Sequence, residues 1–454
     1  MKATSLDSLR ARVVSAHPRT RKAQVNTLIG LAVKGGGMFV SLLLVPLTID
    51  YLSKQTYGTW LTISSIITML TFFDIGIGNG LRNKLSEAIS NRDVTLARSY
   101  ISTAYFCFGL IQTLFVGLFL LVFRYVPWSA ILNTIIPNQQ LQTVVLLTVV
   151  ALAVKLVLDI LSYILYAIQE PGRVSFINFL SNLTVLAGTY VLTRVGGTNL
   201  SYLAAVTAVS PVLILVLSGN WLYRTRLKAY RPAWGFIKLE HARSLLGLGY
   251  QFFLIQLAVI VLFYTDNLII TQLFGPTEVT TYNVAFRYFN AINTLFLIAL
   301  TPYWSAFTEA FVTNDLAWMR TTYRYLQKLW IGLVVVVVGM VLAAHPVYSL
   351  WVGSRVFVPT SLSSCMGLFI IVSCWNNITV ALINGVGKVR LQLYYSLFSA
   401  IINIPLAIWF GRTLMMGSAG VILATSVSLL AGSVLGGLQA EKILAGTAKG
   451  IWGQ

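Results

Sequence analysis

Several ionisable side chains stand inside long apolar runs, where charge is costly, among them Lys34, Lys155, Asp159, Asp266 and Arg287. A charge at the centre of a bilayer costs about 2.5–3.5 kcal/mol by insertion scales, so each needs a partner, a water-filled cavity or a function. Fixed cations at low dielectric constant interact strongly with phosphate, and a buried carboxylate can take up a proton. The chemistry to expect is anion binding coupled to a titrating group.

Asp266 and Arg287 belong to one stretch, which predicts two helices joined by a turn at Gly275-Pro276. If the second helix begins at Glu278, each charge lies about nine residues from the turn, or about 13 Å deep at 1.5 Å per residue. We therefore expect both at one level in neighbouring helices. Two interpretations stay open: a permanent ion pair across the helices, or a coupling carboxylate whose protonation releases the arginine.

Lys155 and Asp159 are four residues apart and share a helix face, which favours a pair that neutralises itself. Lys34 has no carboxylate three or four residues away and precedes three glycines. An unpaired cation at this depth predicts a cavity residue. Lys155 is kept as a further cationic cavity candidate, and Asp159 as a coupling candidate.

Amide and aromatic side chains gather in two of the predicted helices. Asn290 and Asn293 follow the arginine of the eighth run, and Trp375, Asn376 and Asn377 adjoin one another in the tenth. Such groups suit sugar hydroxyls and ring faces, although hydrogen bonding between helices is the safer expectation for a single Asn.

Three alternate glycines, Gly76, Gly78 and Gly80, follow Asp74 near the end of the second apolar run. Each lowers helix propensity by about 1 kcal/mol relative to Ala, so the helix end should be broken or mobile. Close packing through small residues and a hinge are the two interpretations. No strand precedes the glycines and no GxxxxGK[ST] motif occurs, so neither a nucleotide site nor another cofactor is expected.

Composition indicates where these residues lie. The chain of 454 residues is 57% hydrophobic and only 10% charged, with a mean hydropathy of +0.79, whereas charged residues are about 25% of soluble domains. The net charge of +19 does not indicate nucleic acid, because the basic residues lie between apolar runs. The three cysteines and three histidines lack metal-ligand spacing, and the first apolar run is too long for a signal peptide.

Twelve apolar runs are long enough to cross about 30 Å of hydrocarbon. They are 26–50, 58–80, 100–123, 142–167, 174–194, 201–223, 246–274, 278–302, 327–350, 360–386, 391–411 and 417–438. Alternate loops and both tails carry 24 Lys and Arg residues, against five in the opposite loops. The positive-inside rule therefore places both termini in the cytoplasm.

The expected fold is an all-α polytopic membrane protein of twelve helices in two six-helix bundles around a central cavity. A cytoplasmic arm (1–24) precedes the first bundle (25–223), a basic linker (224–244) joins it to the second bundle (245–438), and a cytoplasmic tail (439–454) follows. A faint repeat supports this division, because each half begins with two helices around a short outer turn and then an amphipathic segment, 81–98 or 304–328. Bundles related in this way bind substrate where they meet.

Several motifs resemble those of the bacterial polysaccharide-transporter family, which includes O-antigen flippases, within the multidrug/oligosaccharidyl-lipid/polysaccharide exporter superfamily. They are Tyr57–Trp60, Asp74–Asn83, Thr265–Ile270 with Gly275, and Tyr282–Arg287, and the resemblance covers essentially the whole chain. It implies transfer of an undecaprenyl-diphosphate-linked oligosaccharide, as in lipopolysaccharide biosynthesis, from the cytoplasmic to the periplasmic leaflet of the inner membrane. It also implies a V-shaped, cation-lined cavity and, as further partners, a polysaccharide polymerase and a chain-length regulator. Asp74, Asp266 and Arg287 match the family pattern.

Two other functions remain as alternatives. A drug/cation antiporter of the same superfamily should carry more acid than base in its cavity. A membrane-embedded polymerase or ligase needs an outer catalytic platform, whereas the longest outer loop, Arg124–Gln140, has Arg124 as its only charged side chain. Without an ATP-binding motif, energy should come from an ion gradient, the membrane potential or use of the product.

Overall fold

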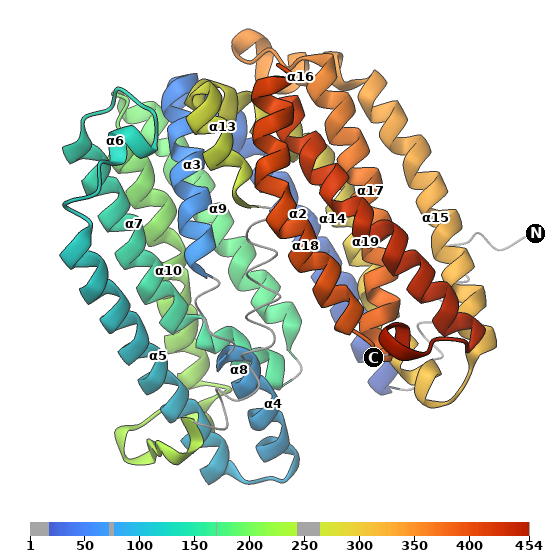
Figure 1. The fold of residues 1–454 in the computed structure, drawn as a ribbon. Helices are drawn as coiled ribbons and strands as arrows, with labels where there is room; N and C mark the ends of the chain where they lie inside the picture. The colour runs from blue at the N-terminus through green and yellow to red at the C-terminus, as the bar shows by residue number, and fades with distance from the viewer. Residues whose placement is uncertain (1–17, 72–76, 169, 243–263, 454) are drawn as a thin grey trace, which may run out of the picture.

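A computed structural model describes residues 18–71, 77–168, 170–242 and 264–453 (Figure 1). These residues form helices, and no strand occurs among them. Eight helices in the described ranges have the length and apolar composition of membrane spans. The protein is therefore an all-helical, multi-pass membrane protein, as its composition predicts.

The first half, residues 18–242, is called the N-half. Its helices pack chiefly as α2 on α9, α7 on α10, and α5 on α4 and α7. They are α2 (Pro18–Tyr51), α3 (Lys54–Leu70), α4 (Ile77–Ser90), α5 (Val94–Val122), α6 (Trp128–Ile131), α7 (Asn138–Leu158), α8 (Ile160–Ala167), α9 (Pro171–Val195) and α10 (Leu200–Arg224), followed by the 3-10 turns η2 (Lys228–Tyr230) and η3 (Trp234–Phe236).

The second half, residues 264–453, is called the C-half, and α17 packs at its centre against α14, α15 and α19. Its elements are α13 (Asp266–Phe274), α14 (Pro276–Val312), α15 (Leu316–Leu342), α16 (Ala344–Val352), η4 (Gly353–Arg355), α17 (Thr360–Val386), α18 (Arg390–Ile408), the π-helical turn η5 (Trp409–Thr413), α19 (Gly417–Ala445) and η6 (Gly450–Gly453). The predicted apolar runs fall on helices of the two halves, apart from 72–76 and 246–263, which lie outside the described residues.

The two halves repeat at an offset of 222 residues. That offset relates the start of α3 and the end of α4 to the two ends of α14, and it relates the starts of α5 and α7 to those of α15 and α17. The turns before α5 and α15 also match, since Arg92 and Asn314 both have φ 58°. The next residues, Asp93 and Asp315, accept hydrogen bonds from backbone N–H groups three residues on. The faint sequence repeat thus has a counterpart in local structure.

Three predicted boundaries differ from the observed ones. Within the second run, α3 ends at Leu70 and the structure describes α4 from Ile77 onward; residues 72–76 of that run lie outside the described residues. The segment 304–328 is not a separate amphipathic element but the end of α14 and the start of α15. The last helix continues to Ala445, beyond the predicted residue 438.

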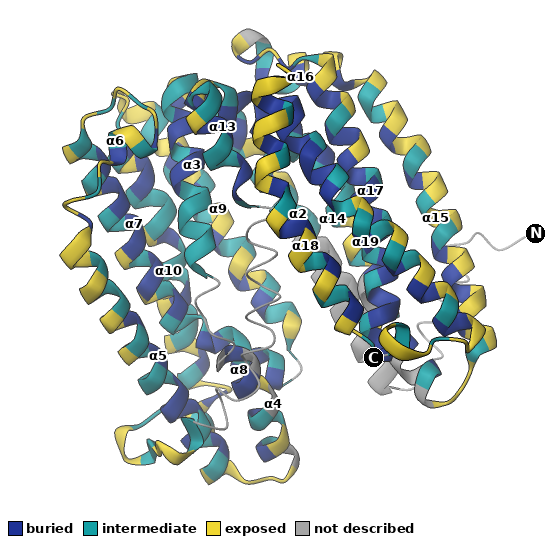
Figure 2. Ribbon diagram, viewed as in Figure 1, coloured by how far each residue is buried: buried dark blue, intermediate teal, exposed yellow. Residues whose placement is uncertain are grey.

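Buried side chains lie where helices face each other, and exposed ones cover the outer surface (Figure 2). Many exposed residues are large and apolar, including Leu118 and Leu121 of α5 and Val335 of α15. On a soluble protein, so many exposed apolar side chains would mark an interaction site or a surface prone to aggregation. Here it is the surface that contacts lipid chains.

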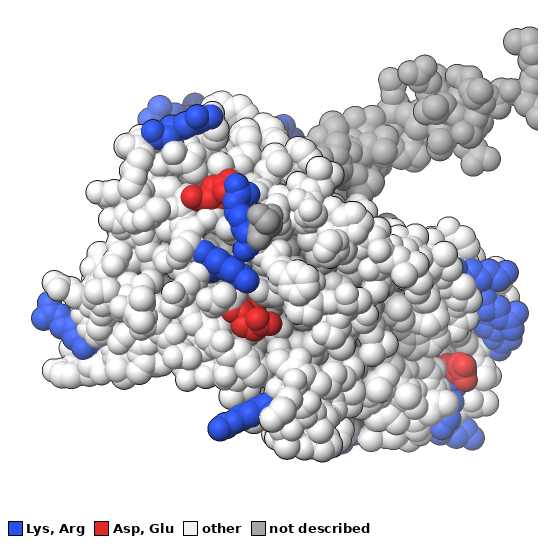
Figure 3. All heavy atoms as spheres, turned by 90° about the horizontal axis from the view of Figure 1, so that it is seen from above, with Lys and Arg blue, Asp and Glu red and all other residues white. Residues whose placement is uncertain are grey.

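The halves converge at one end of the molecule and diverge toward the other (Figure 1). We call these the α3/α13 end and the α4/η3 end. Polar contacts between the halves gather near the first: Thr62 with Thr271 at 2.6 Å, Asn267 to Ser65 at 2.6 Å, Thr280 to the Lys54 carbonyl at 2.7 Å, and Arg355 with Asp50 at 2.7 Å. The face seen at this end carries only scattered charged side chains (Figure 3). A seal therefore closes the α3/α13 end.

Candidate cavity between the two halves

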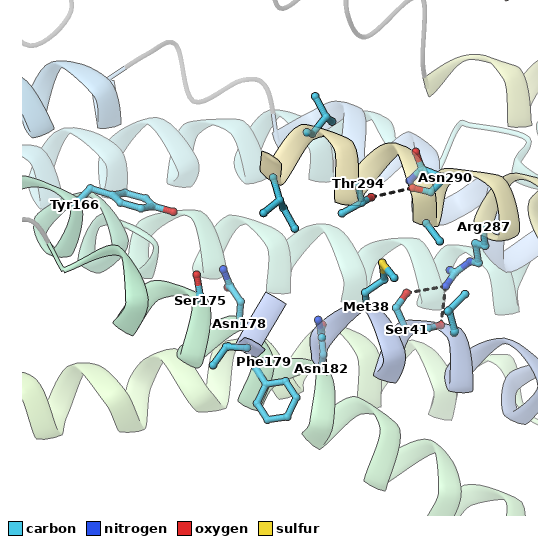
Figure 4. A pocket seen from close by; sticks show the side chains of 16 residues that line it. Met38, Ser41, Tyr166, Ser175, Asn178, Phe179, Asn182, Arg287, Asn290 and Thr294 are labelled. Atoms are coloured by element: carbon cyan, nitrogen blue, oxygen red, sulfur yellow. Dashed lines mark hydrogen bonds between the residues drawn. The ribbon is translucent and has the colours of Figure 1, made fainter. Parts of the chain in front are cut away.

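A cavity of about 550 Å³ lies between the halves, with walls from α2, α9 and α14 and with Tyr166 of α8 (Figure 4). This volume is within the range of small-molecule sites. Arg287 is the only charged residue among the sixteen that line it. The polar lining residues are Ser41, Tyr166, Ser175, Asn178, Asn182, Arg287, Asn290 and Thr294. The wall is therefore half polar and half apolar, and within the described residues it carries a single fixed positive charge.

The guanidinium of Arg287 is held by neutral groups. Its Nη1 donates to the backbone carbonyl and to the Oγ of Ser41 on α2, both at 3.1 Å. The side chain is partly buried, and among the described residues no carboxylate forms an ion pair with it. Because neutral partners orient the group without cancelling its charge, the site keeps an attraction for anions.

The α14 wall follows from helix periodicity. Arg287, Asn290, Ala291 and Thr294 are spaced by three, four and seven residues, so they share one face of α14. Thr294 donates to the Asn290 carbonyl at 2.9 Å and so satisfies its own hydroxyl. Asn290 is also among the residues that line the cavity. Arg287 and Asn290 of the predicted ligand-facing surface thus line this cavity, and ligand binding there stays a prediction.

Asp266 and Arg287 are not at one level, contrary to the prediction. The Tyr282 hydroxyl donates to Oδ2 of Asp266 at 2.6 Å, and Asn283 donates to Asn267 at 2.8 Å. Asp266 therefore lies opposite Tyr282, and Arg287 is five residues, or about 7.5 Å, further along α14. Two of these five residues arise because α14 begins at Pro276 and not at Glu278, since proline suits the first position of a helix; the remainder reflects how α13 and α14 pack. The permanent ion pair is not formed.

The N-half wall contains polar residues that sequence reasoning missed. Ser175, Asn178 and Asn182 of α9 line the cavity together with Phe179. Their spacings of three, four and seven residues place them on one face. Polar residues at helical spacing within an apolar run indicate such a face in the sequence. The predictions rest instead on charged groups and on the Asn residues of the C-half.

Lys155 and Asp159 form an ion pair within the N-half, at the junction of α7 and α8. This confirms the self-neutralising pair that their spacing favours. Neither residue lines the cavity, so the structure does not support Lys155 as a cavity cation. The side chain of Lys34 and all of Asp74 and Gly76 lie outside the described residues, although Lys34 belongs to α2 directly after the lining residue Val33.

Most of the other amide candidates join helices instead of facing the cavity. Asn376 is buried and donates to the Leu429 carbonyl and to Ser433 Oγ on α19, at 3.2 and 2.7 Å. Trp375 donates to the Ser433 carbonyl at 3.1 Å. Asn293 donates to Asn290 at 3.1 Å and accepts from Cys374 of α17.

Of the predicted sugar-facing residues, only Asn290 lines the cavity, and Asn377 is not among its lining residues. The safer expectation of hydrogen bonding between helices is therefore confirmed for Asn376. Its amide is turned toward α19 because α17 is enclosed by α14, α15 and α19.

Gly78 has a packing reason for lacking a side chain. A Cβ at this position would lie 2.1 Å from the Tyr163 ring of α8, closer than any real contact. Gly80 is also buried, in the first turn of α4. Close packing is thus established at Gly78, whereas a hinge role for these glycines stays a prediction.

Comparison with known proteins agrees with this architecture. The chain is 20% identical over 383 residues to "Putative O-antigen export protein" of Yersinia pseudotuberculosis, with 82% of this chain and 85% of the relative covered. An inward-facing multidrug resistance MATE family transporter of the MOP superfamily superposes with a TM-score of 0.74 at 15% identity, covering 93% of this chain and 100% of the other.

A MOP superfamily transporter from Pyrococcus furiosus, described as having a binding pocket of reverse polarity, superposes with a TM-score of 0.61 at 15% identity, covering 94% and 95%. These similarities establish that the chain shares the fold of these proteins. The family model for polysaccharide biosynthesis proteins matches residues 24–307, well over half of the chain. The protein belongs to the polysaccharide biosynthesis protein family.

Proposed function

We propose that the protein is a flippase that moves an undecaprenyl-diphosphate-linked oligosaccharide, an O-antigen or other surface-polysaccharide repeat unit, from the cytoplasmic to the periplasmic leaflet of the bacterial inner membrane. The observation that carries the proposal is the cavity between the halves, whose wall is half polar and whose one charged side chain among the described lining residues is Arg287. The family and the O-antigen export relative supply the substrate class. A polysaccharide polymerase and a chain-length regulator are proposed partners.

In this proposal Arg287 receives the diphosphate. An arginine at low dielectric constant binds phosphate oxygens with charge-assisted, often bidentate, hydrogen bonds. Its present partners, the Ser41 hydroxyl and carbonyl, are neutral, so phosphate oxygens can replace them with a gain in Coulomb energy. The amides of Asn178, Asn182 and Asn290 then face the sugars, and Lys34 is proposed as a second cation.

Transport follows from alternating access between the two halves, proposed to be bundles of six helices each. The halves are sealed at the α3/α13 end by contacts such as Thr62 with Thr271. The excess of basic residues in the loops of the α4/η3 end and in both tails supports a cytoplasmic position for that end. The substrate is then loaded from the cytoplasmic leaflet, and the seal opens after the halves rock.

The membrane potential can drive the step. If two negative charges leave the cytoplasm without counter-ions, a potential of 100 mV favours transfer by about 4.6 kcal/mol, from about 2.3 kcal/mol per charge. A proton can contribute through Asp266, which is buried against the Tyr282 hydroxyl. Because Arg287 lies five residues further along α14, such coupling would act through movement of α14 and not through a direct ion pair.

A drug/cation antiporter is the second candidate, because the superposed MATE structures are multidrug transporters. The cavity argues against it, since no Asp or Glu occurs among the lining residues. A cationic drug would meet Arg287, and like charges repel at low dielectric constant.

The test is a flipping assay in proteoliposomes with a fluorescent polyprenyl-diphosphate oligosaccharide. Outward transfer should rise when a potassium gradient with valinomycin makes the loading side negative. Transfer that is indifferent to the potential and to proton and sodium gradients would contradict the proposed energy source. Transport of cationic dyes without transfer of the lipid-linked sugar would instead establish the antiporter.

A further inference from the structure

A second concave site lies on the outside of the N-half, between α9 and α10. It is a groove of about 310 Å³ whose walls are the apolar side chains of Phe176, Ile177, Leu180, Ile214, Leu217 and Leu222. Phe176, Leu217 and Trp221 are more than half exposed, so the groove opens on the surface that contacts lipid. A hydrocarbon chain is the occupant that matches such walls.

The end of the groove toward the α4/η3 end carries charge. Arg173 lines it, with its guanidinium 5.8 Å from the centre of the Trp221 ring. Glu170 lies between two arginines, with Oε2 at 2.6 Å from Nε of Arg173 and Oε1 at 2.5 Å from Nη2 of Arg226. One carboxylate between two guanidinium groups leaves a net charge of +1 at this end.

Charge and depth together define the ligand. Tryptophan and arginine side chains at a helix end mark the level of lipid headgroups. A cationic cluster there attracts anionic headgroups, at about 1 kcal/mol per basic residue. A ligand with one or two hydrocarbon chains and a phosphate at one end fits both parts of the site.

The groove and the cavity lie on opposite faces of α9. At 100° per residue, the mean direction of Phe176 and Leu180 of the groove lies about 145° from the mean direction of Ser175, Asn178 and Asn182 of the cavity. One molecule bound in the cavity therefore cannot also fill the groove. This separates the groove's occupant from the transported molecule and favours a phospholipid of the bilayer.

We infer that the α9/α10 groove binds an anionic phospholipid, with an acyl chain against Phe176, Leu180 and Leu217 and the headgroup phosphate at Arg173 and Arg226. The bound lipid buttresses α9 from the side opposite the cavity. This assignment does not depend on what the cavity transports.

Native mass spectrometry of the purified full-length protein, delipidated and titrated with phosphatidylglycerol or phosphatidylcholine, tests the inference. The wild type should retain phosphatidylglycerol several-fold better. Arg173→Gln should weaken its retention about fivefold, the equivalent of about 1 kcal/mol. Glu170→Gln should strengthen it by a similar factor, because the carboxylate opposes the phosphate. Arg194→Gln, at the other end of α9, is the matched control and should change nothing.

The opposite signs at Glu170 and Arg173 separate ligand binding from a structural ion pair, since loss of a structural pair would weaken retention in both variants. Equal retention of the two phospholipids by the wild type, or weaker retention in Glu170→Gln, would overturn the inference. So would undecaprenyl phosphate displacing phosphatidylglycerol at equal concentration. If Arg173→Gln fails to fold, Glu170→Gln and a lipid with a photoreactive acyl chain decide the question, because the inference requires crosslinks to residues 213–222.

Discussion

Gly58 is the position where one methyl group should change the conformational equilibrium most. It lies on α3 against the start of α14, so it joins the N-half to the C-half at the α3/α13 end. A Cβ there would sit 1.6 Å from the carbonyl oxygen of Pro276 and 2.5 Å from its carbon, whereas real Cβ atoms essentially never approach within 3.0 Å. Moving from 1.6 to 3.0 Å separates the two helices by about 1.4 Å.

That separation falls within the seal. The contacts of Thr62 with Thr271 and of Thr280 with the Lys54 carbonyl, at 2.6 and 2.7 Å, belong to the same pair of surfaces. An added methyl group in a tight contact costs about 1–3 kcal/mol. Because the clash exists only while the seal is closed, Gly58→Ala should shift the equilibrium toward the open seal by about 5- to 150-fold.

Spin labels at two exposed positions, Ile135 in the N-half and Leu350 in the C-half, would report this shift by pulsed dipolar spectroscopy in nanodiscs. The three native cysteines must first be replaced. Gly58→Ala should enlarge the long-distance population. Gly117→Ala, where a Cβ meets nothing within 4 Å, should resemble the wild type. A Gly58→Ala distribution identical to that of the wild type would refute the assignment of this contact as the seal.

Three further substitutions separate the roles assigned above. Asp266→Asn keeps an oxygen that can accept a hydrogen bond from the Tyr282 hydroxyl but cannot titrate. Transport by this variant in proteoliposomes should therefore lose its pH dependence. If the variant and the wild type have the same pH profile, Asp266 is not the coupling group. Lys155→Met should lower the free energy of unfolding by about 1–3 kcal/mol, because it leaves Asp159 unpaired. The double variant Lys155→Met/Asp159→Leu should recover most of that loss. If thermal melts show no recovery, the pair does not neutralise itself. Asn376→Ala should lower the free energy of unfolding by about 1–2 kcal/mol without altering substrate preference, because its amide joins α17 to α19. An altered preference in competition assays would indicate that Asn376 contacts the substrate.

The helices were predictable because the length of an apolar run is set by bilayer thickness. The predicted runs therefore fall on helices wherever the chain is described. The end of α3 at Leu70 was less visible. The close packing of Gly78 against Tyr163 of α8 joins residues far apart in the chain, which the sequence does not indicate. The glycines predicted a weak helix end but not its exact extent.

The site was predictable where one residue type decides the chemistry. Arg287 was identified because a cation in an apolar run needs a partner, a cavity or a function. Its level relative to Asp266 was wrong by five residues, of which the start of α14 at Pro276 accounts for two. Asn290 and Asn376 carry the same amide, and only the rotation of each helix in the packed structure decides which one faces the cavity. Ser175 and Asn178 of α9 could be identified as cavity residues only once the structure showed that α2 and α14 form the other walls.

The most direct test of the central claim measures transfer of a polyprenyl-diphosphate oligosaccharide across proteoliposomes containing wild type, Arg287→Lys or Arg287→Gln. Loss of a charged, hydrogen-bonded partner of phosphate costs on the order of 1.5–3 kcal/mol, so Arg287→Gln should slow transfer at limiting substrate by about 10- to 150-fold. Arg287→Lys should retain an intermediate rate, because the charge stays and the bidentate geometry is lost. Wild-type rates in Arg287→Gln, with the protein folded and the membrane potential applied, would contradict the assignment of this cavity as the path of the diphosphate.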